Sequence, residues 1–146
     1  RKTMTDQKLT SFNFGNNELA VSFVETMIVK EGVECDVYKF VGDESKDLAI
    51  VRVKQGSKTP LQKILKGDKT IEGFVDGEGT LTIQKINGDN QSHTFSKSDS
   101  GELEVSVGEI MQWHADGDTD LTFYEICWPP YEDGRFENLA DKTTDG

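Results

Sequence analysis

The chain of 146 residues is poor in the residues that most often carry metal, redox or covalent chemistry. It contains two histidines, two cysteines and three prolines. A CxxC pair, an HExxH motif, a Gly-rich phosphate loop and a Gly-x-Ser-x-Gly nucleophile motif are all absent from it. The sequence therefore gives no support to the common kinds of zinc, nucleotide or serine-hydrolase site.

Positive charge is also scarce. Lys and Arg together number 16 against 27 Asp and Glu, which gives a formal net charge of -11. Nucleic acids and anionic membrane surfaces are bound through cationic surfaces that replace or release counterions. The sequence therefore predicts neither a nucleic-acid partner nor a membrane partner.

Long hydrophobic runs are missing as well. No run approaches the ~20 apolar residues of a membrane span, and residues 1–6 contain no hydrophobic signal core. These two features favour a cytoplasmic location. Without a secretory signal, Cys35 and Cys127 are interpreted as two reduced thiols rather than a disulfide.

What the chain does contain is a series of short β-branched segments separated by Gly, Asp and Asn turns. The Asp-Gly-Glu-Gly segment at 76–79 is a strong hairpin signal, because glycine adopts the positive φ that tight turns require. Asn87-Gly88 is a second such signal. Short strands at regular spacing predict an all-β sandwich or barrel. The expected strands span 19–29, 33–40, 48–53, 61–65, 70–75, 80–86, 91–95, 102–107, 110–115 and 121–127.

The predicted organisation is a single domain with two polar extensions. Residues 1–17 are expected to form an N-terminal arm that lies against a barrel spanning 18–131. Residues 132–146 are expected to form a polar C-terminal tail, with a possible short helix near 136–141. A charged loop is expected at 41–47.

Within this pattern, the segment 56–83 resembles the first motif of the cupin family of small β-barrels. That motif has Gly, five residues, His, one residue, His, three or four residues, Glu, six residues and Gly. Gly56 begins the frame and Gly77 closes it in a hairpin very similar to that of the family. The resemblance implies an antiparallel jelly-roll barrel of one domain, and it covers roughly residues 48–131.

A second segment, 106–115, is similar to the second cupin motif of Pro, one residue, Gly, two residues, His, three residues and Asn. Gly108 matches the motif. Met111 occupies the position of its His and Ala115 the position of its Asn. The Trp-Pro-Pro segment at 128–130 also resembles the end of many single-domain cupins.

The metal ligands of the family are replaced. By the same alignment Gln62 and Ile64 occupy the two His positions of the first motif, and Thr70 occupies the Glu position. An amide, a hydrocarbon, a hydroxyl and the thioether of Met111 do not provide the three imidazole or carboxylate ligands that a catalytic first-row metal normally needs. We therefore expect no metal and no other cofactor. Sliding the frame by two residues places Glu72 at the Glu position, but one carboxylate does not make a metal site.

Side chains in a barrel alternate between interior and exterior, so the family frame also predicts which residues face inward. The leading hypothesis is a metal-free barrel whose cavity binds a small, partly apolar molecule. Met and Trp side chains suit flat or apolar ligands, although the same side chains can simply fill a small barrel. The predicted ligand-binding residues are Gln62, Ile64, Thr70, Phe74, Met111 and Trp113.

Two alternatives remain open at this point. One is an isomerase, epimerase or lyase that uses Glu72 or Glu125 as a general base without metal. For Glu125, an ion pair with Arg52 is favoured over a place in the cavity. The other is a filled barrel with a structural or interaction role. His93 and His114 are expected at the surface, and a homodimer is the expected assembly.

Overall fold

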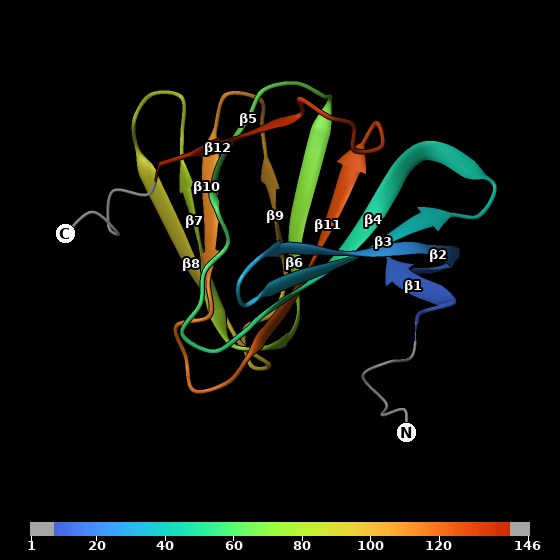
Figure 1. Cartoon of the computed structure of the whole chain (residues 1–146), viewed down its shortest axis with the longest axis horizontal. Coiled ribbons are helices and arrows are strands. Elements are labelled where there is room, and N and C mark those ends of the chain that lie inside the picture. Colours follow the sequence, from blue (N-terminus) through green and yellow to red (C-terminus); the bar gives the residue numbers. More distant parts are fainter. Residues whose placement is uncertain (1–7, 141–146) are drawn as a thin grey trace.

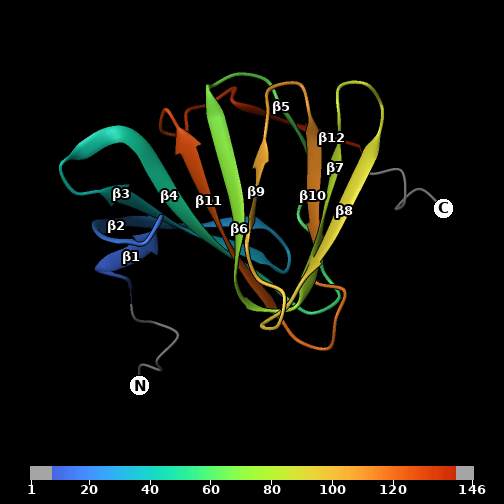
Figure 2. The same ribbon diagram turned by 180° about the vertical axis from the view of Figure 1, so that it is seen from behind.

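The protein folds into two antiparallel sheets that curl toward each other, as Figures 1 and 2 show from opposite sides. The structure is a computed structural model that describes residues 8–140. Across that range it contains strands and turns but no helix, so no helix long and apolar enough to cross a membrane is found there. The chain has the all-β architecture that its sequence predicts.

The larger sheet has seven strands in the order β1-β2-β3-β4-β11-β6-β9. The smaller sheet has five, in the order β12-β5-β10-β7-β8. In the same orders, the strands of the larger sheet are Ser11–Phe14, Asn17–Lys30, Val33–Phe40, Asp43–Val53, Leu121–Trp128, Lys69–Gly77 and Glu102–Val105. Those of the smaller sheet are Phe136–Leu139, Leu61–Ile64, Ile110–His114, Gly79–Gln84 and Asn90–Phe95.

The connection between β6 and β7 turns at the predicted Gly77, but it joins the larger sheet to the smaller one. β6 pairs with β9 and β11, and β7 pairs with β8 and β10, so the expected hairpin pairing of these two strands is not formed. The φ of Gly77 is +85°, and a Cβ atom there would lie 1.8 Å from the backbone oxygen of Asp120. Both the positive φ and the close approach of the next loop therefore require glycine.

The main hydrophobic core lies between the inner faces of the two sheets. Alternation along each strand places every second side chain there. Trp113 on β10 stacks on Phe123 of β11 with ring centroids 4.4 Å apart, and it lies 5.5 Å from Phe95 of β8. Leu81 and Leu121 in the same cluster are fully buried. This packing fills the end of the barrel bounded by β7, β8 and β10.

A second core covers the outer face of the larger sheet. The β1–β2 hairpin folds over that face and brings Phe12 to 5.0 Å from the Tyr124 ring and Phe14 to 5.9 Å from the Trp128 ring. Residues 11–14, which the sequence assigned to a polar arm, therefore form strand β1. Both phenylalanines contact aromatic rings of β11, which lies more than a hundred residues further along the chain.

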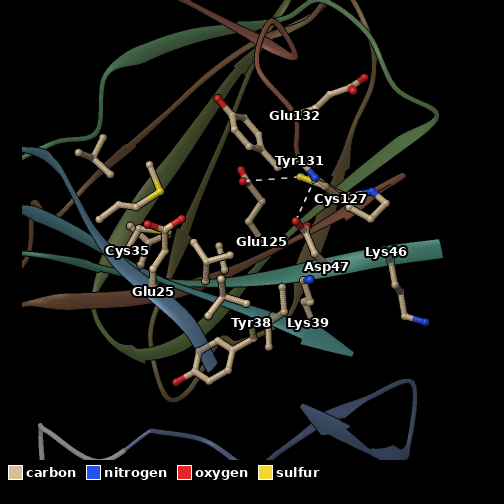
Figure 3. Close-up of a pocket in the computed structure, with 18 of the residues that line it drawn as sticks. Glu25, Cys35, Tyr38, Lys39, Lys46, Asp47, Glu125, Cys127, Tyr131 and Glu132 are labelled. Atoms are coloured by element: carbon tan, nitrogen blue, oxygen red, sulfur yellow. Dashed lines mark hydrogen bonds between the residues drawn. The ribbon is translucent and has the colours of Figure 1, made fainter. Parts of the chain in front are cut away.

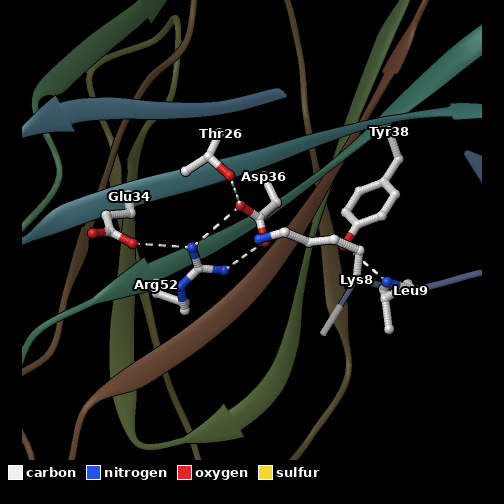
Figure 4. A network of polar contacts seen from close by, with 7 residues as sticks. All are labelled: Lys8, Leu9, Thr26, Glu34, Asp36, Tyr38 and Arg52. Atoms are coloured by element: carbon white, nitrogen blue, oxygen red, sulfur yellow. Dashed lines mark hydrogen bonds and ion pairs between the residues drawn. The ribbon is translucent and has the colours of Figure 1, made fainter. Parts of the chain in front are cut away.

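A polar network ties β2, β3 and β4 together on this outer face (Figure 4). Asp36 is 4% exposed and accepts hydrogen bonds from Arg52 at 2.8 and 3.2 Å and from Thr26 at 2.7 Å. Lys8 lies 3.3 Å from the same carboxylate, and Glu34 binds the other side of Arg52 at 3.0 Å. Burial raises the pKa of Asp36, but the hydrogen bonds from Arg52 and Thr26 outweigh it and hold the pKa below 3.8.

Two further expectations about local structure were wrong. The charged segment at 41–47 is not a long loop, because β4 begins at Asp43 and only a tight turn separates it from β3. Residues 136–139 form strand β12 rather than a helix, since they pair with β5 from Phe136 opposite Ile64 to Leu139 opposite Leu61. In both places, pairing with a neighbouring strand overrides weak local preferences. Residues 141–146 lie outside the described range.

Candidate functional site

One side of the barrel is open, and a hollow of about 1550 Å³ lies there between the inner face of β2, β3, β4 and β11 and the strands β5 and β12. We call this cavity the hollow. Its deep wall is mainly apolar, and Figure 3 shows the polar groups that reach into it. The apolar wall is made by Val33, Cys35, Val37, Ala49, Val51 and Phe123.

The hollow is open because the strands on its two sides differ greatly in length. β2 and β4 have 14 and 11 residues, whereas β5 and β12 have four each. Strand β1 pairs with β2 only from Asn17 to Ala20, so most of β2 is paired on one side alone within the described chain. Val24, Met27 and Val29 line the rim and are 40–45% exposed.

Glu125 points into the hollow from β11 (Figure 3). It shares the inward face of the strand with Phe123 and Cys127, and the Cys127 thiol donates a weak hydrogen bond to its Oε1 at 3.8 Å. The ion pair favoured for Glu125 from the sequence was wrong, because Arg52 lies on the outer face with Glu34 and Asp36. Strand parity decides the matter: Arg52 and Glu125 belong to adjacent strands but point to opposite faces.

Glu72 lies directly opposite Glu125 in the β6–β11 register. Its side chain is completely buried, and its Oε1 accepts a hydrogen bond from the indole N–H of Trp113 at 2.8 Å. Its Oε2 is also buried, and no donor among the described residues reaches it. The structure thus places two carboxyl groups side by side, one sealed in the core and one facing the hollow.

Burial and the neighbouring Glu125 together favour the protonated form of Glu72. Burial raises the pKa of Glu72 well above 4.5, and the charge of Glu125 and a hydrogen bond to it raise it further, against the opposing effect of the Trp113 indole. A protonated Glu72 can donate a hydrogen bond to Glu125, because two neighbouring carboxyl groups repel each other when both are ionised. The two residues form a carboxyl–carboxylate pair at the inner end of the hollow.

Asp47 adds a third acidic group at this end. It lies opposite Cys127 in the β4–β11 register, and its Oδ2 accepts the backbone N–H of Tyr131 at 3.0 Å. Burial raises the pKa of Asp47 to about 6, Glu125 contributes in the same direction, and the Tyr131 hydrogen bond opposes them. Sequence reasoning missed Asp47 because it placed this residue in a loop.

Replacing Glu72 by Gln is expected to stabilise the protein at neutral pH by about 1–3 kcal/mol, because the amide can donate to Glu125 without the proton uptake that a buried Glu72 needs above its unfolded pKa. The raised pKa of Glu72 stabilises the fold fully below its unfolded value of 4.5, and this contribution is lost as pH rises toward the folded pKa. The advantage of Glu72→Gln should therefore grow with pH above 4.5.

Urea denaturation of the wild type and Glu72→Gln at several pH values measures this difference directly. Asp36 and Asp47 titrate in both proteins, so their effects cancel in the subtraction. An exposed Glu104→Gln variant on the adjacent strand β9 serves as the control, with a pH-independent difference near zero. A constant difference for Glu72→Gln, or a loss of stability at neutral pH, would contradict the burial of a protonated Glu72.

The ligand-binding residues predicted from the sequence all face the barrel interior, but they occupy different parts of it. Gln62 lines the hollow. Ile64, Met111 and Trp113 belong to the packed core, and Phe74 packs against it. Thr70 is buried at the other edge, where its hydroxyl accepts a hydrogen bond from Arg135 at 3.1 Å. Their role as ligand contacts stays a prediction, and the accessible surface lies instead on β3, β4 and β11.

The wall on β3 and β4 could have been found from the sequence. Val33, Cys35 and Val37 alternate with Glu34 and Asp36, which is the pattern of a strand with one apolar face. The prediction followed the two family motifs, which lie on other strands, and therefore did not include this face.

Gln62, Ile64, Thr70 and Met111 occupy the four positions that correspond to metal ligands in the family. Met111 lies opposite Gln62 in the β10–β5 register. Their side chains do not form the imidazole and carboxylate set of a first-row metal centre, and the hydroxyl of Thr70 is engaged by Arg135. Among residues 8–140, no group of three or more His, Cys, Asp or Glu side chains is arranged to hold a metal ion.

The remaining candidate groups lie outside the hollow or are chemically inert. His93 is on β8, 3.3 Å from the Asp99 carboxylate, and its ring packs 4.3 Å from Phe95. His114 pairs with Lys58 through an isolated bridge at the end of β10. Both cysteines are free. Burial raises the pKa of the Cys35 thiol to about 12, and burial also raises that of Cys127, so neither is a nucleophile at neutral pH.

Comparison with solved structures shows the fold that this geometry represents. Oxalate decarboxylase from Lactobacillus farciminis in a formate complex superposes with a TM-score of 0.64 at 18% identity, covering 82% of this chain and 33% of that one. The capsular polysaccharide assembling protein CapF from Staphylococcus aureus gives 0.64 at 15% identity, covering 82% and 35%. An S161A mutant of Bacillus subtilis oxalate decarboxylase gives 0.64 at 19% identity, covering 77% and 29%.

This chain therefore spans about a third of the length of these proteins. No protein-family model matches it, and no curated protein matches its sequence. At identities below 20% the similarity defines architecture rather than activity. Two curled antiparallel sheets, the glycine turn that joins β6 to β7 and these structural neighbours together show that the chain has the cupin fold.

Proposed function

We propose that the protein binds a small, partly apolar molecule in the hollow of its cupin barrel. The observation that carries this proposal is the hollow itself, a space of about 1550 Å³ with an apolar wall and a carboxylate, Glu125, at its inner end. Small-molecule sites are commonly concave and mostly apolar, with a few convergent polar groups that orient the ligand. The hollow has this composition.

The burial of the surrounding side chains also supports binding at this place. Val33 and Val51 are 1% and 7% exposed, so the inner wall is rigidly packed on β3 and β4. Cys35, Val37 and Glu125 are half-buried and face the space. A ligand with an apolar body gains by covering this half-exposed surface.

The test uses 2-phenylethanol as a neutral aromatic probe and a variant that fills the hollow. Val37→Trp places an indole in the space, whereas Lys63→Trp on β5 adds the same group outside the lining. Titration monitored by protein NMR is expected to show saturable binding to the wild type and to Lys63→Trp, with at least tenfold weaker binding to Val37→Trp. Equal binding by all three folded proteins, or none by the wild type, would contradict the proposal.

A second candidate function is metal-independent proton transfer by the Glu72–Glu125 pair, and the position of Glu125 favours it. Glu125 is accessible from the hollow while Glu72 behind it is protonated, so the pair can take up a substrate proton at Glu125 and hold it. Isomerisation, epimerisation and lyase reactions of a carbon acid need such a base. Exchange of the acidic hydrogen of a bound carbon acid with D₂O, lost in Glu125→Gln, is the expected result.

The homodimer predicted from the sequence stays a prediction. The filled-barrel alternative is disfavoured on the β3–β4 side, where the hollow lies, although the end bounded by β7, β8 and β10 is filled as that alternative expects. Both ideas concern assembly and packing, and neither changes the residues that face the hollow.

A further inference from the structure

The hollow has a strong excess of negative charge. Seven acidic side chains line it, against two lysines. Lys46 is already bound to Asp43 in an ion pair, and Lys39 is exposed at the rim. At the inner end, where a ligand would be most fully enclosed, the lining is formed by carboxyl groups. The positive charge of Arg135 acts on Asp47 from outside the lining, but its guanidinium is already bound to backbone oxygens and to Thr70.

Glu125 is the central group of this end. Among the described residues it has no ion pair with a Lys, Arg or His, and its hydrogen bonds are the weak one from the Cys127 thiol and the one that it shares with Glu72. An opposite charge stabilises a half-buried carboxylate. The described chain provides none for Glu125, so this position is open to a cation from outside the chain.

Glu72 places the negative charge of the pair at the hollow. Its Oε2 is fully buried without a donor, and the register of β6 and β11 places Glu72 directly beside Glu125. Buried polar atoms in native proteins are nearly always satisfied. Because burial favours the protonated form of Glu72, this oxygen can donate to Glu125, and the negative charge of the pair then lies on Glu125, which faces the hollow.

The donor that fits is an organic cation rather than a metal ion. Within residues 8–140 the acidic groups do not converge into a set of three that could chelate a metal. They are spread around a wide space whose wall carries Val51, Phe123 and other apolar side chains. An ammonium group on an apolar body can reach the carboxylates singly and cover the wall at the same time.

We propose that the occupant of the hollow is a small organic cation, a protonated amine on an apolar body, whose ammonium group binds Glu125 and whose body lies against the β3–β4 wall. This assignment rests on the proposed function, since it names the chemical class of the molecule bound in the hollow. Asp47, on the neighbouring strand, faces the same end and contributes to the attraction.

Three probes of one shape and different charge test the assignment: 2-phenylethylamine, 2-phenylethanol and phenylacetate. Calorimetric titration at neutral pH and low ionic strength is expected to give a dissociation constant for the amine at least about tenfold lower than that for the alcohol. Phenylacetate should show no measurable binding. Added salt should weaken binding of the amine and leave binding of the alcohol unchanged.

Glu125→Gln keeps the size of the side chain and removes its charge. It is expected to reduce the affinity for the amine about tenfold and to leave the affinity for the alcohol within about twofold. Asp43→Asn is the matched control, because Asp43 is already paired with Lys46 at the outer rim. If Glu125→Gln fails to fold, Asp47→Asn with the same three probes takes its place.

The outcomes separate this assignment from the proposed function. Equal affinities for the amine and the alcohol, both abolished by Val37→Trp, would overturn the cation assignment and leave binding in the hollow intact. Tighter binding of phenylacetate would overturn it in the same way. Binding of the amine that survives Val37→Trp would place it outside the hollow and overturn both. No binding of any probe would contradict both as well.

Discussion

Replacing Trp113 by Ala is expected to lower the free energy of unfolding by about 3–5 kcal/mol, the usual cost of deleting a buried indole. Trp113 is 1% exposed and stacks on Phe123 at 4.4 Å. Within residues 8–140, its N–H is also the one donor to the buried carboxyl of Glu72. The variant therefore loses packing and leaves both Glu72 oxygens without a donor, which adds to the cost of the cavity.

Trp113→Phe separates these two effects. It keeps an aromatic ring against Phe123 and removes only the indole N–H and part of the volume, so a smaller loss of about 1–3 kcal/mol is expected. Chemical denaturation followed by circular dichroism avoids the change in fluorescence that loss of one of two tryptophans causes. A loss below about 1 kcal/mol for the Ala variant would contradict the position of Trp113 in the core.

The second large effect concerns Arg135, which closes the barrel edge beside β6 and β11. Its side chain is 1% exposed and donates hydrogen bonds to the backbone oxygens of Pro129, Lys69 and Trp128 at 2.8–3.2 Å. Arg135→Met keeps the length of the side chain and leaves these buried oxygens without donors. We expect a loss of about 2–4 kcal/mol in the free energy of unfolding.

Lys66→Met is the matched control for Arg135→Met. Lys66 is close to Arg135 in the fold, but its side chain is half exposed and pairs only with the exposed Glu132 at 3.3 Å. Its replacement should change the free energy of unfolding by less than about 1 kcal/mol. Similar losses in the two variants, measured by urea denaturation, would show that Arg135 is not the structural element described above.

Much of the fold could be predicted from the sequence because the signals are local. The turn at Gly77 and the alternation along 80–86 depend on neighbouring residues, and both were recognised together with the family frame around them. Strand β1 could not be predicted, because the surface that Phe12 and Phe14 cover includes Tyr124 and Trp128, which are distant in the sequence. Strand β12 likewise exists only because β5 offers it a partner edge.

The candidate site was harder to predict for the same reason. The parity of β11 allowed Glu125 to face the cavity, but a sequence cannot show that Arg52 is engaged by Asp36 on the other face. The adjacency of Glu72 and Glu125 is a matter of strand register between segments some fifty residues apart. Which part of a barrel is filled and which is hollow depends on the relative lengths of paired strands, and these were known only from the structure.

The central claim is that the open side of this cupin barrel, rather than its packed end, is the binding site. Methyl-resolved NMR spectra recorded during titration with 2-phenylethylamine test it most directly. The account predicts saturable chemical-shift changes at Val33, Val37 and Val51 of the wall, with little change at Leu81 and Ile83 of the packed end. Changes concentrated at Leu81 and Ile83, or no saturable changes at any methyl group, would contradict it.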